Sequence, residues 1–404
     1  MTQLAINGGS RIFPEGFGFE LWPPVRPETA EKLKEVYLSC RWSFYGEEEK
    51  KFAADFARYH DASYGIFMVN GTVTLESALR ALDIGPGDEV VVPSWTWMAT
   101  GMAPVYVGAT PVFADGEKDT FCLDPEAFEA AITPRTRAVI PVHLFGSMAD
   151  LDRIVAIARR HDIKVIEDCA HAHGGKWNGR GVGSFGDVGS FSFQQSKIMT
   201  AGEGGECVTS DPELFDRLGR LSHIGYQFGA ERGKASVPPP PNLFCRNYRA
   251  TEFQAAILAE ELAHLEEDSR YRAANADYLH AELNRIPGIA TQKPGRRATM
   301  QSYYVFGVTV DPAMLKPGKT RDDVIAALNA EGAVEVFAGW GAPTFRQKLW
   351  NVSPDRYRVA GAAAVEEIIA NRIILLDIRW LMSERSILEK LVEAFHKVMK
   401  EYGK

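Results

Sequence analysis

The 404-residue sequence lacks several features that would indicate a membrane, a nucleic acid or a disulfide-stabilised fold. No apolar run reaches membrane-spanning length, and no basic region followed by an apolar stretch opens the chain. The formal net charge of −8 argues against nucleic acid or an anionic membrane as a partner. The five cysteines show no Cys-x-x-Cys spacing, which favours reduced thiols. We therefore expect a cytoplasmic protein, and the length predicts two domains.

Apolar strands alternate with helices from about residue 66 onward. The expected strands are 66–69, 89–93, 111–114, 138–144 and 164–168. The expected helices between them are 72–82, 125–132 and 151–160. This alternation, with strands that are apolar throughout, predicts an α/β fold with a mostly parallel sheet covered on both faces.

The pattern changes after residue 174. A glycine-rich hairpin or loop is expected over 174–189, and strands at 190–194 and 206–210 flank a polar turn. Beyond them we expect a helix over 211–222, an irregular connection over 225–242 and a long helix or helix pair over 251–285. We place a large first domain over 1–254 and a smaller C-terminal domain of α+β character over 255–404.

Two residues carry the chemical argument. Lys197 lies in the polar turn, and Asp168 ends the apolar strand 164–168, at the edge where open α/β sheets bind ligands. Pyridoxal phosphate (PLP) needs an amine that holds its aldehyde as a Schiff base and a carboxylate that keeps its ring nitrogen protonated. A turn lysine is usually solvated and a strand-end aspartate often caps a turn, so each residue alone indicates little. The pair predicts a PLP site.

Other candidates have ordinary alternatives. Cys169, His171 and His173 alternate along the chain, but no fourth metal ligand is spaced nearby, so we predict no metal and interpret His171 as a cofactor contact. The segment 70–72 opens a helix whose free amides suit a phosphate, although a plain helix cap has the same appearance. One of two tryptophans in 93–97 is a candidate to stack on a flat ring, with ordinary packing as the alternative.

A glycine pattern over 181–186 matches the dinucleotide-binding fingerprint. That fingerprint must follow a strand directly and open a helix. Here it lies in a glycine-rich loop and leads into another strand. We therefore reject a dinucleotide site.

In this order, the motifs resemble the DegT/DnrJ/StrS-type sugar aminotransferases, which have the fold type I architecture of the PLP-dependent aspartate aminotransferase. The resemblance covers nearly the whole chain. It rests on the segments 70–72, 93–97, 141–146, 167–174, 190–197, 202–205 and 247–254. It implies the aspartate aminotransferase-like fold, PLP as cofactor and transamination as the reaction.

The resemblance also implies roles for single residues. Lys197 would be the Schiff-base lysine and proton shuttle, and Asp168 would pair with the ring nitrogen. His171 would lie against the ring or its hydroxyl, and Trp97 would stack on the ring face. Some relatives carry histidine at the lysine position and act as dehydratases, so the lysine kept here favours transamination.

The phosphate of the cofactor is implied to lie at a second group of residues. Ser192 would bind it together with the backbone amides of Gly71, Thr72 and Val73. Asn247 resembles a residue that reaches the phosphate from a neighbouring subunit. The resemblance therefore implies a homodimer with shared active sites.

Three segments, 5–9, 168–174 and 194–197, look most like glutamine-dependent inosose (ketocyclitol) aminotransferases and the related aminohydroxybenzoate synthases. The implied function is PLP-dependent, ping-pong transfer of an amino group from glutamine or glutamate to a ketocyclitol such as scyllo-inosose, in aminocyclitol antibiotic biosynthesis. The alternatives are an aminotransferase for nucleotide-linked keto sugars and a PLP-binding regulatory protein without catalysis. The segments 42–46 and 337–340 are predicted to face the substrate.

Overall fold

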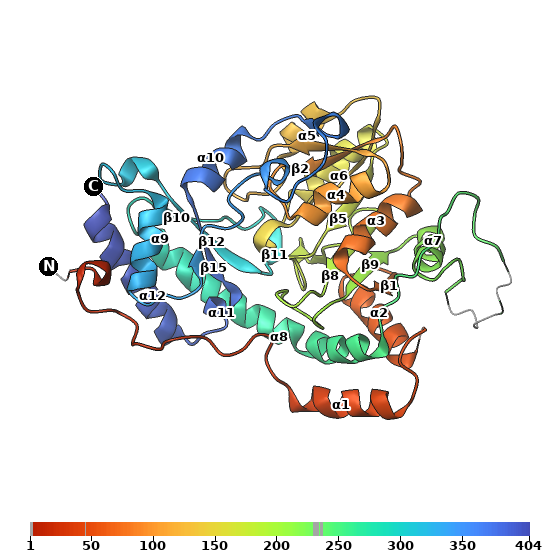
Figure 1. Ribbon diagram of the computed structural model, residues 1–404, viewed down its shortest axis with the longest axis horizontal. Helices are drawn as coiled ribbons and strands as arrows, with labels where there is room; N and C mark the ends of the chain where they lie inside the picture. The colour runs from red at the N-terminus through yellow and green to blue at the C-terminus, as the bar shows by residue number, and fades with distance from the viewer. Residues whose placement is uncertain (1–2, 45, 229–233, 235–236) are drawn as a thin grey trace.

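The computed structural model describes residues 3–44, 46–228, 234 and 237–404. Its centre is an eight-stranded sheet in the order β1-β9-β8-β5-β4-β2-β3-β14 (Figure 1). The six strands from β8 to β14 are parallel. At one edge, β9 pairs antiparallel with β8 on one side and with β1 on the other. The predicted, mostly parallel sheet is confirmed. Its strands are β1 Tyr64–Met68, β2 Glu89–Pro93, β3 Thr110–Ala114, β4 Thr136–Val139, β5 Lys164–Asp168, β8 Val188–Ser192, β9 Gly205–Thr209 and β14 Arg358–Val359.

Helices cover both faces of this sheet because alternate strand residues point to opposite sides. Val91 and Val139 pack in one core with α5, α6 and α10, while Val90 and Val92 pack in another with α3, α4 and α7. The first group comprises α5 Pro125–Ala131, α6 Leu151–Arg160 and α10 Ala363–Asn371. The second comprises α3 Gly71–Ala81, α4 Met98–Tyr106 and α7 Pro212–Ser222.

Several elements begin or end at residues other than those predicted from the sequence. The strand expected over 138–144 stops at Val139, because the chain then turns into the short 3₁₀ helix η2 Leu144–Gly146. The expected hairpin over 174–189 is formed by β6 Lys176–Trp177 and β7 Arg180–Gly181, and β11 Ala298–Met300 pairs with β6. The irregular connection expected over 225–242 includes residues 229–233, 235 and 236, which lie outside the described residues. The helix α4 was not predicted from the sequence.

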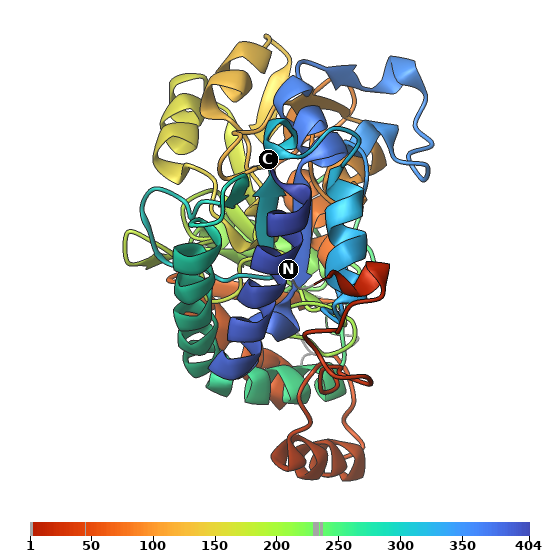
Figure 2. The same cartoon turned by 90° about the vertical axis from the view of Figure 1, so that its left-hand side faces the viewer.

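The C-terminal part forms a second core around a four-stranded antiparallel sheet. The order β10-β12-β15-β13 corresponds to Ile289–Thr291, Val305–Val310, Ile373–Asp377 and Val336–Phe337. The helices that pack here are α9 Arg321–Ala330, α11 Ile378–Leu381 and α12 Arg385–Tyr402. Leu4 and Phe13 lie in the same core, so the N-terminal segment and the C-terminal helix occupy one end of the molecule (Figure 2).

One long helix joins the two parts. The helix α8, Glu252–Leu283, has Leu258 and Leu265 in the first part and Leu279 and Leu283 in the C-terminal core. The expected helix or helix pair over 251–285 is thus a single helix, with α1 Pro27–Leu38 and α2 Glu47–Tyr59 packed against it. The domain division at residue 255 stays a prediction. No helix in the described part of the chain is long and apolar enough to cross a membrane.

The rejected glycine motif holds a buried carboxylate instead of a nucleotide. Glu167, next to Asp168 on β5, accepts hydrogen bonds from the backbone N–H groups of Gly183 at 2.9 Å, Phe185 at 2.7 Å and Gly186 at 2.9 Å. Both carboxylate oxygens are therefore already bound by the loop.

His143 completes the environment of Glu167. Its Nδ1 accepts from the backbone N–H of Ala149, so its proton lies on Nε2, which is 3.4 Å from Glu167 Oε2. Although His143, Glu167 and Cys169 present possible ligand atoms within 4.8 Å of one another, the amides occupy the carboxylate that a metal would need. The cluster is best explained as a structural hydrogen-bond network.

We predict that Glu167→Ala lowers the free energy of unfolding by about 3 to 5 kcal/mol, because it leaves buried donors without an acceptor. Burial acts to raise the pKa of Glu167, but His143 and the amides outweigh it and hold that pKa below its ordinary value. The contribution of Glu167 is therefore full above the ordinary glutamate pKa of about 4.3 and is lost as the pH falls through the lower folded value.

Urea unfolding from pH 7 down to pH 3 measures this contribution. The control is Glu129→Ala, which breaks an exposed ion pair with Arg160 and should change stability little. A Glu167→Ala protein as stable as this control at pH 7 would show that the loop does not depend on the carboxylate.

Candidate active site

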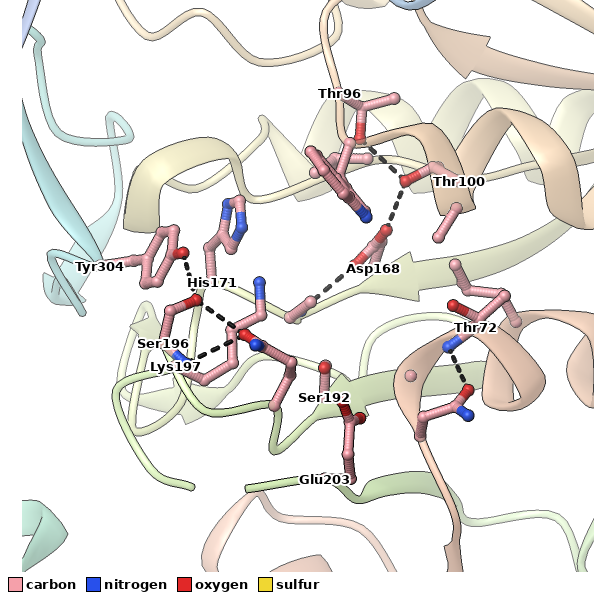
Figure 3. A pocket seen from close by; sticks show the side chains of 18 of the residues that line it. Thr72, Thr96, Thr100, Asp168, His171, Ser192, Ser196, Lys197, Glu203 and Tyr304 are labelled. Carbon is pink, nitrogen blue, oxygen red and sulfur yellow. Dashed lines mark hydrogen bonds between the residues drawn. The ribbon is translucent and has the colours of Figure 1, made fainter. Parts of the chain in front are cut away.

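A cavity of about 590 Å³ lies at the carboxyl ends of β5 and β8 (Figure 3). Lys197 and Asp168 both line it, so the two residues that the sequence predicted to act together face the same space. Other predicted residues in its lining are Gly71, Thr72, Trp97, His171 and Ser192. Val73 and Asn247, which the structure also describes, are not part of this lining.

Asp168 is buried at the end of β5, with each carboxylate oxygen held by one donor. Thr100 Oγ1 donates to Oδ2 at 2.7 Å, and the backbone N–H of Ala170 donates to Oδ1 at 3.2 Å. Burial raises the pKa of Asp168, and these two donors and the charge of Lys197 oppose the rise. A cation placed against this carboxylate would favour its ionised form further.

Lys197 lies in the turn that follows β8, with its amine directed into the cavity (Figure 3). Burial lowers the pKa of Lys197 to about 8, against the attraction of Asp168. Near that pH a large fraction of the amine is neutral and can act as a nucleophile or base. The Nζ atom lies 4.7 Å from the centre of the Tyr304 ring, which forms one wall.

The N-terminal segment fastens this turn from outside. The indole N–H of Trp22 donates to the carbonyl of Lys197 at 3.2 Å. The Gln195 side-chain amide donates to the carbonyl of Trp22, also at 3.2 Å. These reciprocal bonds fix the backbone that carries the lysine.

His171 is a neutral ring in this site. Burial lowers its pKa well below the ordinary value, and the charge of Lys197 lowers it further. Its Nδ1 accepts from the backbone N–H of Phe145 at 3.3 Å, so the proton lies on Nε2. The ring stacks on Tyr304, with centroids 4.1 Å apart and planes 14° from parallel. Both rings line the cavity.

The two tryptophans of the segment 93–97 have different positions. Trp95 is buried and packs on Phe121 and Phe145. Trp97 lines the cavity, is 49% exposed and lies 5.6 Å from Trp340 between ring centroids. Of the two, only Trp97 has a ring face at the cavity where a flat ligand would stack.

The start of α3 provides the opposite end of the cavity. Asn70 Oδ1 accepts from the backbone N–H groups of Thr72 at 3.1 Å and Val73 at 3.0 Å, so the expected helix cap is present. A Cβ on Gly71 would lie 2.6 Å from the Cβ of Ser192. Glycine at this position therefore lets the helix start approach the Ser192 hydroxyl closely, which gives a compact place for an anion.

Several lining residues were not predicted from the sequence: Asn70, Thr96, Thr100, Gln194, Ser196, Glu203 and Tyr304. The Tyr304 hydroxyl donates to Ser196 Oγ at 2.9 Å, since Ser196 gives its own proton to Gln194 Oε1 at 2.8 Å. Of the segments expected to face the substrate, 337–340 contributes Trp340. None of the described residues 42–44 and 46 lines the cavity, and Tyr45 lies outside the described residues.

A mostly parallel sheet, a strand-end carboxylate, a buried lysine amine and a glycine-opened helix together define a fold type I aminotransferase. These residues fit PLP, because the amine, the carboxylate and the anion-binding end surround one cavity lined by flat rings. The chain belongs to the DegT/DnrJ/EryC1/StrS aminotransferase family, whose model matches residues 24–395.

Curated relatives and solved structures agree with this assignment. The chain is 36% identical to an L-glutamine:2-deoxy-scyllo-inosose aminotransferase of Streptomyces kanamyceticus over 98% of this chain and 97% of the relative. It is also 36% identical to the enzyme of that name from Micromonospora echinospora, over 98% of both chains.

Two crystal structures have the same fold. The 3-amino-5-hydroxybenzoic acid synthase superposes with a TM-score of 0.83 and 30% identity, covering 95% of this chain and 99% of that one. An aminotransferase from Psychrobacter cryohalolentis gives a TM-score of 0.87 and 31% identity with the same coverage. The predicted fold class and family are confirmed.

We predict that Gly71→Ala weakens PLP binding at least tenfold, because the new methyl group has to displace Ser192 or the start of α3. The measurement is a titration of the cofactor-free protein followed by absorbance. Gly18→Ala is the matched control, since a Cβ there meets nothing within 4 Å. Equal affinity of the two variants for PLP would contradict a close approach at this point.

Proposed function

We propose that this aminotransferase uses PLP to move an amino group from glutamine or glutamate to a ketocyclitol such as scyllo-inosose, by ping-pong kinetics. The observation that carries the proposal is the placement of Lys197 and Asp168 around one cavity. The names of the full-length relatives support glutamine as donor and a ketocyclitol as acceptor.

Each side chain has a distinct part in this reaction. When bound, PLP supplies a protonated ring that accepts electron density from the carbon losing its proton. Asp168 holds the proton of the ring nitrogen, and Lys197 Nζ binds the cofactor and moves the proton at the α-carbon of the donor. Trp97 would stack on the ring, and His171 would lie against the ring or its hydroxyl.

The proposal also assigns residues to the phosphate of PLP and to the contact with a second subunit. Ser192, the Thr72 hydroxyl and the N–H of Gly71 bind the phosphate. The backbone N–H groups of Thr72 and Val73, which were also expected to bind it, already donate to Asn70 Oδ1. Asn247 is exposed and outside the cavity lining of its own chain, which suits a residue that serves a second subunit.

Exposed apolar side chains near Asn247 support a homodimer. An isolated β-bridge joins His223 to Asn247; Ile224, which follows His223, is 57% exposed, and Phe244 is 65% exposed. Large apolar side chains that gather beside a functional residue mark interaction surfaces. We propose that this face meets a second copy of the chain.

The charge of the cavity favours a neutral acceptor. Among the described lining residues Lys197 is the one lysine, no arginine is present, and Glu203 adds a carboxylate. A nucleotide-linked sugar carries a diphosphate that normally needs several cationic or amide donors. The hydroxyl and amide groups of Gln194, Ser196 and Tyr304 instead suit the hydroxyl groups of a cyclitol.

We predict that Lys197→Ala abolishes the visible absorbance of the PLP-loaded protein and its turnover. In the wild type, the rate at which cofactor-free protein gains this absorbance should rise with pH through about 8, because the neutral amine is the attacking form. Lys293→Ala, which removes an exposed lysine paired with Asp119, is the control and should behave as wild type. A persisting visible band in Lys197→Ala would assign the cofactor to another amine.

The donor and acceptor are tested in two separate additions. Glutamine or glutamate alone should remove the visible band, and scyllo-inosose added next should restore it, whereas a nucleotide-linked keto sugar should not. Restoration by the nucleotide-linked sugar alone would reverse the choice of acceptor. A protein that binds PLP but responds to neither glutamine, glutamate nor alanine would be the regulatory alternative.

A further inference from the structure

Three buried threonines form a hydrogen-bonded group that leads to Asp168. Thr100 is in the first turn of α4, Thr96 precedes that helix, and Thr344 opens the short 3₁₀ helix η4, Thr344–Arg346. All three residues are buried, with at most 1% of their surface exposed. Buried hydroxyls in contact with one another form networks whose members depend on each other.

The direction of each hydrogen bond in this chain follows from the number of protons available. Thr100 has one hydroxyl proton and donates it to Asp168 Oδ2 at 2.7 Å, because an ionised carboxylate can only accept. In the 2.8 Å contact between the hydroxyls of Thr96 and Thr100, the donor is therefore Thr96. The bonds run in one direction, from Thr96 to Thr100 to Asp168, so each polarises the next.

We call the bonds from Thr96 to Thr100 to Asp168 the relay. Thr344 holds the backbone of Thr96, the first residue of the relay. Its hydroxyl accepts from the N–H of Thr96 at 3.2 Å and donates to the carbonyl of the same residue at 2.8 Å. The peptide groups of Thr96 are thus held on both sides by one side chain. The backbone from which the Thr96 hydroxyl projects is thereby fixed in place.

The hydrogen bonds end at Asp168, the carboxylate that the proposed function places against the ring nitrogen. We propose that Thr100 is a positioning residue for Asp168, and that Thr96, held by Thr344, orients Thr100. This inference rests on the proposed function in one respect, since it requires the ring nitrogen of PLP to lie against Asp168. The hydroxyl fixes the orientation of the carboxylate and favours its ionised form, which keeps the ring nitrogen protonated.

The test uses Thr100→Val, which keeps the shape of the side chain and removes its hydroxyl. We expect the ¹⁵N chemical shift of ring-labelled PLP on the protein to move toward that of an unprotonated pyridine. Loss of one hydrogen bond to a charged group should also lower kcat about tenfold, with KM for the donor little changed. Thr100→Ser restores a hydroxyl and should recover both values.

Three further variants make the result specific. Thr209→Val removes a buried hydroxyl bond to the carbonyl of Asp187 far from the cavity and controls for a general loss of stability. Asp168→Asn is the positive control, with a fully shifted ¹⁵N signal and a kcat lower by orders of magnitude. Thr96→Val should shift the signal in the same direction as Thr100→Val but by less, because it acts through one more bond.

A ¹⁵N shift that is the same in Thr100→Val and Thr209→Val would overturn the inference, whatever their melting temperatures. A larger effect of Thr96→Val than of Thr100→Val would contradict the order of the relay. A wild type with an unprotonated ring nitrogen would instead overturn the role of Asp168 in the proposed function, and the inference with it.

Discussion

The structure depends on two opposite charges that share one buried cavity. Burial disfavours the charged form of each group, which lowers the pKa of Lys197 and raises that of Asp168, and the attraction between them opposes both effects. A cationic ring held against Asp168 would replace Lys197 as the positive charge that balances this carboxylate. The lysine amine would then be free to act as nucleophile and base, so the pair is organised to receive a third group.

The strand β5 separates this reactive carboxylate from a structural one. Glu167 and Asp168 are adjacent, so they point to opposite faces, and each has its own hydrogen-bond donors. Amides of the glycine loop hold Glu167, while Thr100 and Ala170 hold Asp168. A shift of one residue along β5 would exchange the two, and the loop amides therefore help to set the register on which the active carboxylate depends.

The sequence allowed prediction of those parts of the site that follow from local order along the chain. Asp168, Ser192 and Lys197 lie at strand ends and in the turn beyond, and the alternation of strands and helices brings strand ends to one edge. Tyr304 and Thr344 enter from over a hundred residues further on, and no spacing within the sequence links them to Lys197 or Asp168. The role of the Thr100 hydroxyl could not be predicted either, because α4 was not predicted and the hydroxyl contacts Asp168, which lies 68 residues further along the chain.

This division has a chemical consequence. The residues to which we assign the proton and the cofactor lie at the edge of the large sheet, whereas Tyr304 and Trp340 bring aromatic surface from the C-terminal part. Thr344, four residues after Trp340, hydrogen-bonds to the backbone of Thr96, whose hydroxyl contacts Thr100. Trp340 at the cavity and Thr344, which holds the backbone of Thr96, therefore lie in one segment of the chain.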